Sequence, residues 1–315
     1  MIIFLSILII FHVVFYYKYK ENLANEKFLS KQNKFNFDLK EGFYNLKLGV
    51  YDSGGEITFN ENGIICKNYG NNIGLRFSPV LIAQFLLSTN DKINALLHLN
   101  FVLDELVVLT DKQNYLVKYD FDWVYDEQKA PWYSSMAQGQ LCSAFCRWYR
   151  LLDSEKYLES ACKFIDAVEE TNEENNFYLK LANSARWYKE YPNCKHSVLD
   201  GSLTMLAGIY DLSKISKQTK YINILHYGLN GFLNNWKIFK RPFGGVYYHS
   251  FEGRNNMNYY RYTHKLLNYL STLNPVMFNQ IIQDYKLPKY LLLRLYNYLI
   301  EGLKFRLGLT RHNLK

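Results

Sequence analysis

The chain has 315 residues, of which 49% are hydrophobic, so it can bury a sizeable core and is not an intrinsically disordered tail. Its formal net charge of +8 favours a polyanionic partner: nucleic acid, an anionic membrane surface or an acidic polysaccharide. Aromatic residues make up 17% of the chain, and their rings can pack against sugars as well as against nucleic-acid bases. An A/T-rich genome would enrich the same residues without any such function. The sequence has no helix-turn-helix, zinc-finger or RNP-like pattern, so we expect no nucleic-acid partner.

Residues 1–17 are almost wholly apolar and are followed by several lysines, which predicts a membrane segment over residues 1–20. Without a charged leading region or a cleavage site it is typical of an uncleaved anchor, and residues 21–40 read as a charged tether. The lysines on its C-terminal side place the rest of the chain in the cytoplasm by the positive-inside rule. The absence of an Asn-x-Ser/Thr sequon agrees with that orientation.

Residues 41–75 predict a small β region, with a strand at 43–50, turn residues at 52–55, and two more strands at 57–59 and 63–66. From Pro79 onward the apolar residues recur at helical spacing, and residues 76–315 form the predicted α/α domain. Helices are predicted over residues 79–87, 93–109, 197–212, 221–235, 264–273 and 290–305, and apolar stripes mark two more at 141–152 and 158–168. Beyond Pro79, strand signals interrupt the helical pattern only near residues 238–248.

This pattern predicts a mainly α fold: an incomplete (α/α) toroid of paired helices, with loops at one end forming a cleft. A tetratricopeptide array is set aside because no repeat of fixed period is present. The five cysteines, an odd number without a Cys-x-x-Cys pair, predict free thiols and no metal site. No G-x-G-x-x-G follows an early strand, so we expect neither a nucleotide nor any other cofactor.

The first motif, residues 132–140, reads WYSSMAQGQ. Tyr133, Gln138 and Gln140 carry groups that hydrogen-bond sugar hydroxyls and carboxylates. The small residues between them let a backbone approach a ligand, but they equally predict close packing between two helices.

The second motif, residues 186–192, reads RWYKEYP and places the carboxylate of Glu190 beside the phenol of Tyr191. Cations at Arg186 and Lys189 flank this pair, as proton transfer by a phenol at neutral pH requires. Taken alone, Glu-Tyr-Pro is more typical of a turn or a helix end.

The third motif, residues 260–264, reads YRYTH, and a GVY sequence that ends at Tyr247 precedes it. Tyrosine-rich runs before a helix are usually packed edges. Both segments nevertheless offer further phenols, together with Arg261 and His264.

In spacing and order the three motifs resemble the C-terminal domain of the D-glucuronyl C5-epimerases, with their W-Y-S-A-M-A-Q-G-Q, W-Y-E-E-Y-P and Y-H-T-T-H patterns. Residues 200–212 are similar to the family's N-G-F-x-x-S-L-x-G-L-Y-D-L helix, and the likeness spans about residues 70–275. It implies conversion of D-glucuronate to L-iduronate in a heparosan-like polymer, with one proton leaving C5 and another arriving on the opposite face. An anionic uronate-containing polysaccharide would then be the partner.

The resemblance implies that Glu190, Tyr191, Tyr247 and Tyr260 are catalytic, with Tyr259 as a competitor for the last role. The residues implied in substrate binding are Tyr133, Gln138, Gln140, Arg186, Tyr188, Arg254, Arg261 and His264. This chain departs from the family at Lys189, where a glutamate is usual, and after Tyr247, where the D-L-R sequence is missing. If the arginine of that family sequence holds the substrate carboxylate, its role passes to Arg254 or Arg261 here or is reduced.

The sequence is also compatible with two other functions. A uronate lyase of the α/α-toroid kind shares C5 proton abstraction, and a membrane-tethered polysaccharide-binding protein would need no catalysis. The large β-domains that precede this region in animal enzymes are mostly missing here. Those enzymes face the Golgi lumen, which conflicts with the orientation given by the charges; a homodimer is compatible with the sequence.

Overall fold

The computed structural model describes residues 57–70, 73–123, 128–170, 176–192, 194, 197–241, 245–247 and 257–287. The helices are α2 (Pro79–Ser88), α3 (Lys92–Phe101), α4 (Ser135–Leu152), α5 (Glu155–Glu169), α6 (Leu199–Ser216), α7 (Thr219–Asn235), α8 (Met257–Leu270) and α9 (Pro275–Asp284). The strands are β1 (Ile57–Phe59), β2 (Ile65–Asn68), β3 (Leu75–Arg76), β4 (Val107–Leu109), β5 (Tyr115–Tyr119), β6 (Trp132–Tyr133), β7 (Tyr178–Lys180) and β8 (Arg186–Tyr188). The predicted anchor, the tether, the strand at 43–50 and the helix at 290–305 lie outside these ranges.

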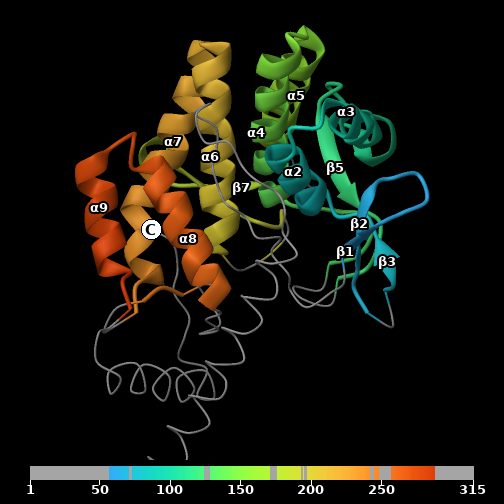
Figure 1. Ribbon diagram of the computed structural model, residues 1–315. Helices are drawn as coiled ribbons and strands as arrows, with labels where there is room; N and C mark the ends of the chain where they lie inside the picture. The colour runs from blue at the N-terminus through green and yellow to red at the C-terminus, as the bar shows by residue number, and fades with distance from the viewer. Residues whose placement is uncertain are drawn as a thin grey trace, which may run out of the picture.

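The described part is mainly helical, as the sequence predicted (Figure 1). Helix α4 packs against α2, α5 and α6, and α6 in turn contacts α7 and α8. Helix α9 covers α8, while β1 to β3 lie at the other side of the molecule, near α2 and α3. Helices α4 and α6 therefore form the centre of the fold.

Helices α2, α3 and α4 begin where the sequence supplies a side-chain capping group. Ser78 precedes Pro79 and accepts the backbone N–H of Leu81 at the start of α2. Asp91 accepts from the first turn of α3, and Ser134 accepts from Ala137 in α4. These side chains satisfy N–H groups that have no partner within the helix, which fixes where each helix starts.

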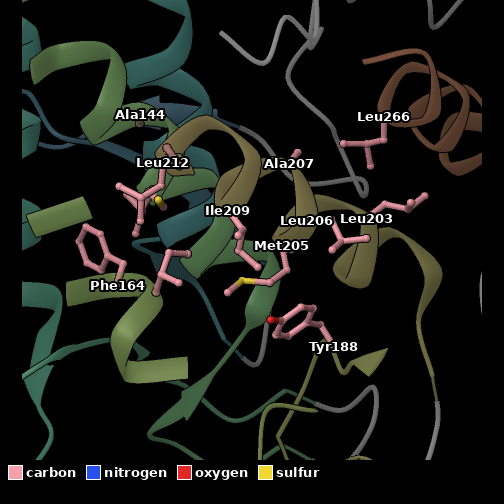
Figure 2. Packing of buried hydrophobic residues seen from close by; sticks show 14 of the residues in the cluster. Ala144, Phe164, Tyr188, Leu203, Met205, Leu206, Ala207, Ile209, Leu212 and Leu266 are labelled. Carbon is pink, nitrogen blue, oxygen red and sulfur yellow. The ribbon is translucent and has the colours of Figure 1, made fainter. Parts of the chain in front are cut away.

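Helices α4 and α6 approach closely because a glycine of each lies at their crossing. A Cβ on Gly139 would lie 2.6 Å from the carbonyl oxygen of Thr204, and one on Gly208 would lie 2.3 Å from the carbonyl oxygen of Gly139. Figure 2 shows the apolar side chains of α6 between Phe164 of α5 and Leu266 of α8. Gly139, one of the small residues of the first motif, thus serves helix packing.

In the described part of the chain, three small antiparallel sheets accompany the helices: β1-β2-β3, β4-β5-β6 and β7-β8. The strands predicted at 57–59 and 63–66 correspond to β1 and β2. The expectation that strand signals beyond Pro79 are confined to residues 238–248 was wrong, since β4 to β8 all precede that segment. The predicted helix at 93–109 ends in a π-helical turn and then β4, because the chain must reverse to pair with β5.

Near residues 238–248, the described residues form a 3₁₀ helix, Trp236–Phe239, and a β-bridge between Lys240 and Val246. Within the described ranges, no helix is both long and apolar enough to cross a membrane. The segment predicted as an anchor is not among them.

Candidate active site

The first and second motifs meet at the start of α4. The backbone N–H of Ser135 donates to the carbonyl of Glu190 over 2.8 Å, and the Ser135 hydroxyl donates to the carbonyl of Lys189 over 2.5 Å. Both serine groups are buried. This double contact fixes the backbone that carries Glu190 and Tyr191.

Tyr191 is buried in an aromatic cluster that belongs to the same junction. Trp132 stacks on Tyr119 with ring centroids 3.8 Å apart, and its edge meets Tyr191 at 5.7 Å. The Trp132 indole N–H donates to the carbonyl of Phe121 over 2.7 Å, which orients the ring. Tyr191 is therefore held by the first motif.

The third motif reaches the same place through α6. The hydroxyl of Thr263 donates to Asp200 Oδ1 over 2.5 Å. A Cβ on the next residue, Gly201, would lie 2.5 Å from the Cβ of Glu190, so the start of α6 lies directly against the Glu190 side chain. Asp200 thus stands between the second and third motifs.

A second polar link lies deeper in the core. The hydroxyl of Tyr262 accepts a hydrogen bond from the Gln140 amide over 2.8 Å and lies 2.9 Å from the Thr204 hydroxyl. All three side chains are buried. Gln140, predicted to bind substrate, contacts the third motif, so it fixes α8 against α4 and α6.

Tyr260 and Tyr247 are both tied to the segment that follows α9. The Tyr260 hydroxyl accepts the backbone N–H of Leu287 over 3.2 Å, and the Tyr260 ring packs on His264 at 4.3 Å. The N–H of Gly245, two residues before Tyr247, donates to the carbonyl of Lys286 over 2.8 Å. The last two proposed catalytic tyrosines therefore share a support.

A buried arginine lies beside Tyr247. The Arg241 guanidinium is 5.6 Å from the centroid of the Tyr247 ring, and both side chains are at most 8% exposed. The phenol of Tyr247 thus has the permanent positive charge of Arg241 as a neighbour.

Burial lowers the pKa of His264, while the contact of His264 with the Tyr285 carbonyl acts in the opposite direction.

Gln138 has no polar atom left for a substrate. Its Oε1 accepts the N–H of Val117 over 3.0 Å, and its Nε2 donates to the carbonyls of Tyr115 and Phe164 over 2.8 and 3.0 Å. The side chain is fully buried. It ties β5 and α5 to α4, and we therefore assign it a structural role.

Arg186 and Tyr188 both bind Glu169 at the end of α5. Arg186 forms an ion pair with this carboxylate and lies over the rings of Tyr178 and Tyr227. The Tyr188 hydroxyl donates to Glu169 over 3.0 Å, and burial raises its pKa. The charge of Arg186 is therefore already balanced within the protein.

The remaining predicted residues, and Lys189 beside Glu190, differ in their exposure, and the side chains of two of them lie outside the described part of the chain. Arg261 is exposed on the first turns of α8, and Tyr133 in β6 is half-buried with a pKa raised by burial. Lys189 is buried, donates to the carbonyl of Pro192, and has a pKa lowered by burial. Arg254 and the side chain of Tyr259 lie outside the described part of the chain.

Three residues in or near the site had no role predicted from the sequence: Asp200 and Thr263 at the junction, and Arg241 beside Tyr247. Asp200 and Thr263 sit inside the quoted motifs, so their positions were visible, but their contact spans 63 residues of sequence. Arg241 precedes Tyr247 by six residues and had no motif to mark it. Across the described ranges, no cluster of three or more His, Cys, Asp or Glu residues is arranged to hold a metal ion.

Residues 111–288 match the family described as D-glucuronyl C5-epimerase C-terminus. Within the chain, 85 residues are 36% identical to the D-glucuronyl C5-epimerase of Caenorhabditis elegans. That match covers 27% of this chain and 14% of the nematode protein, so the chain accounts for a small part of that relative's length.

Two solved structures share a weaker likeness. A family 76 glycoside hydrolase α-mannanase from Bacteroides thetaiotaomicron gives a TM-score of 0.47 at 12% identity, over 72% of this chain and 63% of that one. Cellobiose 2-epimerase from Bacillus thermoamylovorans gives 0.42 at 13% identity, over 66% and 56% of the two chains. Neither similarity indicates the reaction of this chain.

Proposed function

The chain belongs to the D-glucuronyl C5-epimerase family through its C-terminal domain, and on that premise we propose that it converts D-glucuronate to L-iduronate within a heparosan-like polymer. The observation that carries the proposal is the junction of the three motifs, at which the Ser135 N–H binds the Glu190 carbonyl and Thr263 binds Asp200. Residues of the first and third motifs, which lie 120 or more positions apart in the sequence, could act on the same substrate there.

Epimerisation at C5 needs two proton-transfer groups, one on each face of the sugar. The C5–H bond breaks, its proton passes to one group, and its electron pair spreads into the neighbouring carboxylate. A second group then delivers a proton to the opposite face, with no net redox change and no leaving group. We assign these roles to two of Tyr191, Tyr247 and Tyr260, and a supporting role in proton transfer to Glu190.

The negative charge that develops on the substrate needs a cation nearby. Arg241 lies beside Tyr247 and would stabilise negative charge on that phenol or on the substrate carboxylate. Arg261, exposed on α8, and Arg254 are the further candidates for the carboxylate. Arg186 is the weakest candidate, since Glu169 already pairs with it.

The proposal extends to the architecture of the whole chain. The paired helices would form an incomplete (α/α) toroid, and the cleft would lie at the end where the three motifs meet. Tyr133 and His264 would line it and bind the anionic polysaccharide. Residues 1–17 would anchor the protein in a membrane, with the side of the membrane left open; a homodimer is compatible with this arrangement.

Incubation of the full-length chain with heparosan and with N-sulfated heparosan, followed by NMR of the polymer, tests the proposal. Iduronate signals in a polymer of unchanged length would support it. Absorbance from 4,5-unsaturated uronate ends would identify a lyase instead, and an unchanged but bound polymer would identify a binding protein. Either of the last two results would overturn the epimerase assignment.

A further inference from the structure

Two carboxyl side chains are buried together at the junction of the motifs. Glu190 is 5% exposed and Asp200 is 1% exposed. The main chain of Gly201, the residue after Asp200, lies against the Cα, Cβ and Cγ atoms of Glu190, so the start of α6 packs directly on the Glu190 side chain. Two negative charges buried near one another are costly, because burial removes the water that would solvate and screen them.

The partners of Asp200 do not supply a balancing charge. Its Oδ1 accepts the Thr263 hydroxyl from α8 over 2.5 Å, which is a neutral donor. Its Oδ2 is buried and has no hydrogen-bond partner among the described residues. The charge of Glu190, in the loop after β8, acts on Asp200. Among the described residues, no Lys, Arg or His side chain forms an ion pair with Asp200.

Resting on the proposed function, we propose that Asp200 is a positioning residue that stands as a neutral carboxylic acid between Glu190 and Thr263, and leaves Glu190 as the only ionised carboxylate of the pair. Burial raises the pKa of Asp200 well above its ordinary value, and the charge of Glu190 raises it further, whereas the Thr263 bond acts in the opposite direction. A proton on Asp200 relieves the repulsion and lets α6 and α8 close on the Glu190 side chain. This proton stays on Asp200 and does not enter the reaction.

The arrangement makes the junction sensitive to alkali. When Asp200 loses its proton, its charge repels Glu190 across the Gly201 contact. The same ionisation alters the acceptor of Thr263, which lies one turn along α8 from Tyr260. We therefore expect the rate of epimerisation to fall in alkali with the ionisation of Asp200.

Infrared spectroscopy of the full-length chain in deuterated water tests the protonation state without any substrate. The wild-type protein should show the C=O stretch of a protonated carboxyl group at neutral pD, and Asp200→Asn should lack it. In Glu190→Gln the band should disappear at lower pD than in the wild type, because the repelling charge is gone. Absence of the band from the wild type, or its persistence in Asp200→Asn, would overturn the proposal.

Thr263→Val covers the case in which Asp200→Asn does not fold. It removes the hydrogen bond that favours ionised Asp200, so the band should persist to higher pD than in the wild type. An unchanged titration would contradict the proposed contact.

The pH profile of epimerisation then tests positioning. Asp200→Asn should keep more activity than Asp200→Ala, and its alkaline limb should move to higher pH; equal losses with an unmoved limb would refute the positioning role. The two proposals fail separately. A protonated band without any conversion of the polymer would remove the epimerase function, whereas conversion without the band would remove the neutral Asp200.

Discussion

The backbone N–H of Ser135 donates to the carbonyl of Glu190 over 2.8 Å, and this bond between residues 55 positions apart joins the first and second motifs. Ser135 is the first residue of α4, so its N–H has no acceptor within the helix. The bond satisfies that group and at the same time sets the position of Glu190 and Tyr191. The start of α4 is therefore part of the candidate site.

Tyr191→Phe should reduce the rate of iduronate formation strongly if the phenol transfers a proton. General acid–base groups contribute about 10² to 10⁴-fold, and we expect a loss in that range with little change in folding. Tyr210→Phe is the matched control, since the Tyr210 hydroxyl bonds Thr272 at an exposed position outside the site. Equal rates in both variants would exclude Tyr191 from catalysis.

Arg241→Gln should lower kcat by removing the positive charge beside Tyr247. Electrostatic stabilisers of this kind contribute about 10² to 10³-fold when buried. Lys240→Gln changes the neighbouring residue, whose ion pair with Asp284 is partly exposed and contributes about 0–1 kcal/mol. Steady-state kinetics of the two variants should differ, and similar values would show that Arg241 has no special role.

Gln138→Ala should destabilise the fold and leave KM unchanged. The variant loses three hydrogen bonds to backbone groups of β5 and α5, each contributing about 1 kcal/mol net. Tyr133→Phe, by contrast, should raise KM with little effect on stability, because this phenol is half-buried and proposed to bind substrate. Thermal unfolding and kinetics separate the two. A raised KM in a stably folded Gln138→Ala protein would contradict the structural role.

Gly201→Ala should displace Glu190. The added methyl group would lie 2.5 Å from the Glu190 Cβ and 3.0 Å from its Cα, which is too close for either atom to stay in place. Overpacking of this kind costs about 1–3 kcal/mol, and the rate of epimerisation should fall even at temperatures at which the variant is folded. Activity at the wild-type level would show that the position of Glu190 is not critical.

Acid should destabilise the fold through His98. Its Nε2 accepts the N–H of Ile65 over 3.0 Å, and its Nδ1 lies 2.7 Å from the carbonyl of Asn94, so the neutral ring is protonated on Nδ1. Burial lowers the pKa of His98 from 6.5, although the Asn94 bond opposes this. The unfolded chain therefore binds the proton more readily.

The stability that His98 contributes is thus fully present above pH 6.5 and is lost as the pH falls through the lower value of the folded state. The melting temperature of the wild type should decrease more between pH 7 and pH 5 than that of His98→Gln. Parallel decreases would assign the acid sensitivity to other groups.

Much of the helical core was predictable because its apolar residues recur at the helical period, as Leu141, Phe145 and Trp148 do in α4. The strand β5 was missed because its five residues lie between helical segments and its pairing is set by distant contacts. Gln138 illustrates the limit for the site: its residue type and motif suggested a ligand contact, but only the fold reveals the three backbone groups that occupy it. The contact of Asp200 with Thr263 could not be predicted from the sequence either, because the fold alone brings these distant residues together.

The most direct measurement is NMR detection of deuterium at C5 after incubation of the full-length chain with heparosan in deuterated water. The proposed reaction predicts deuterium at C5 of both glucuronate and iduronate, in a polymer that keeps its length, and much slower incorporation with Glu190→Gln. A polymer that binds the protein but gains no deuterium would contradict the central claim.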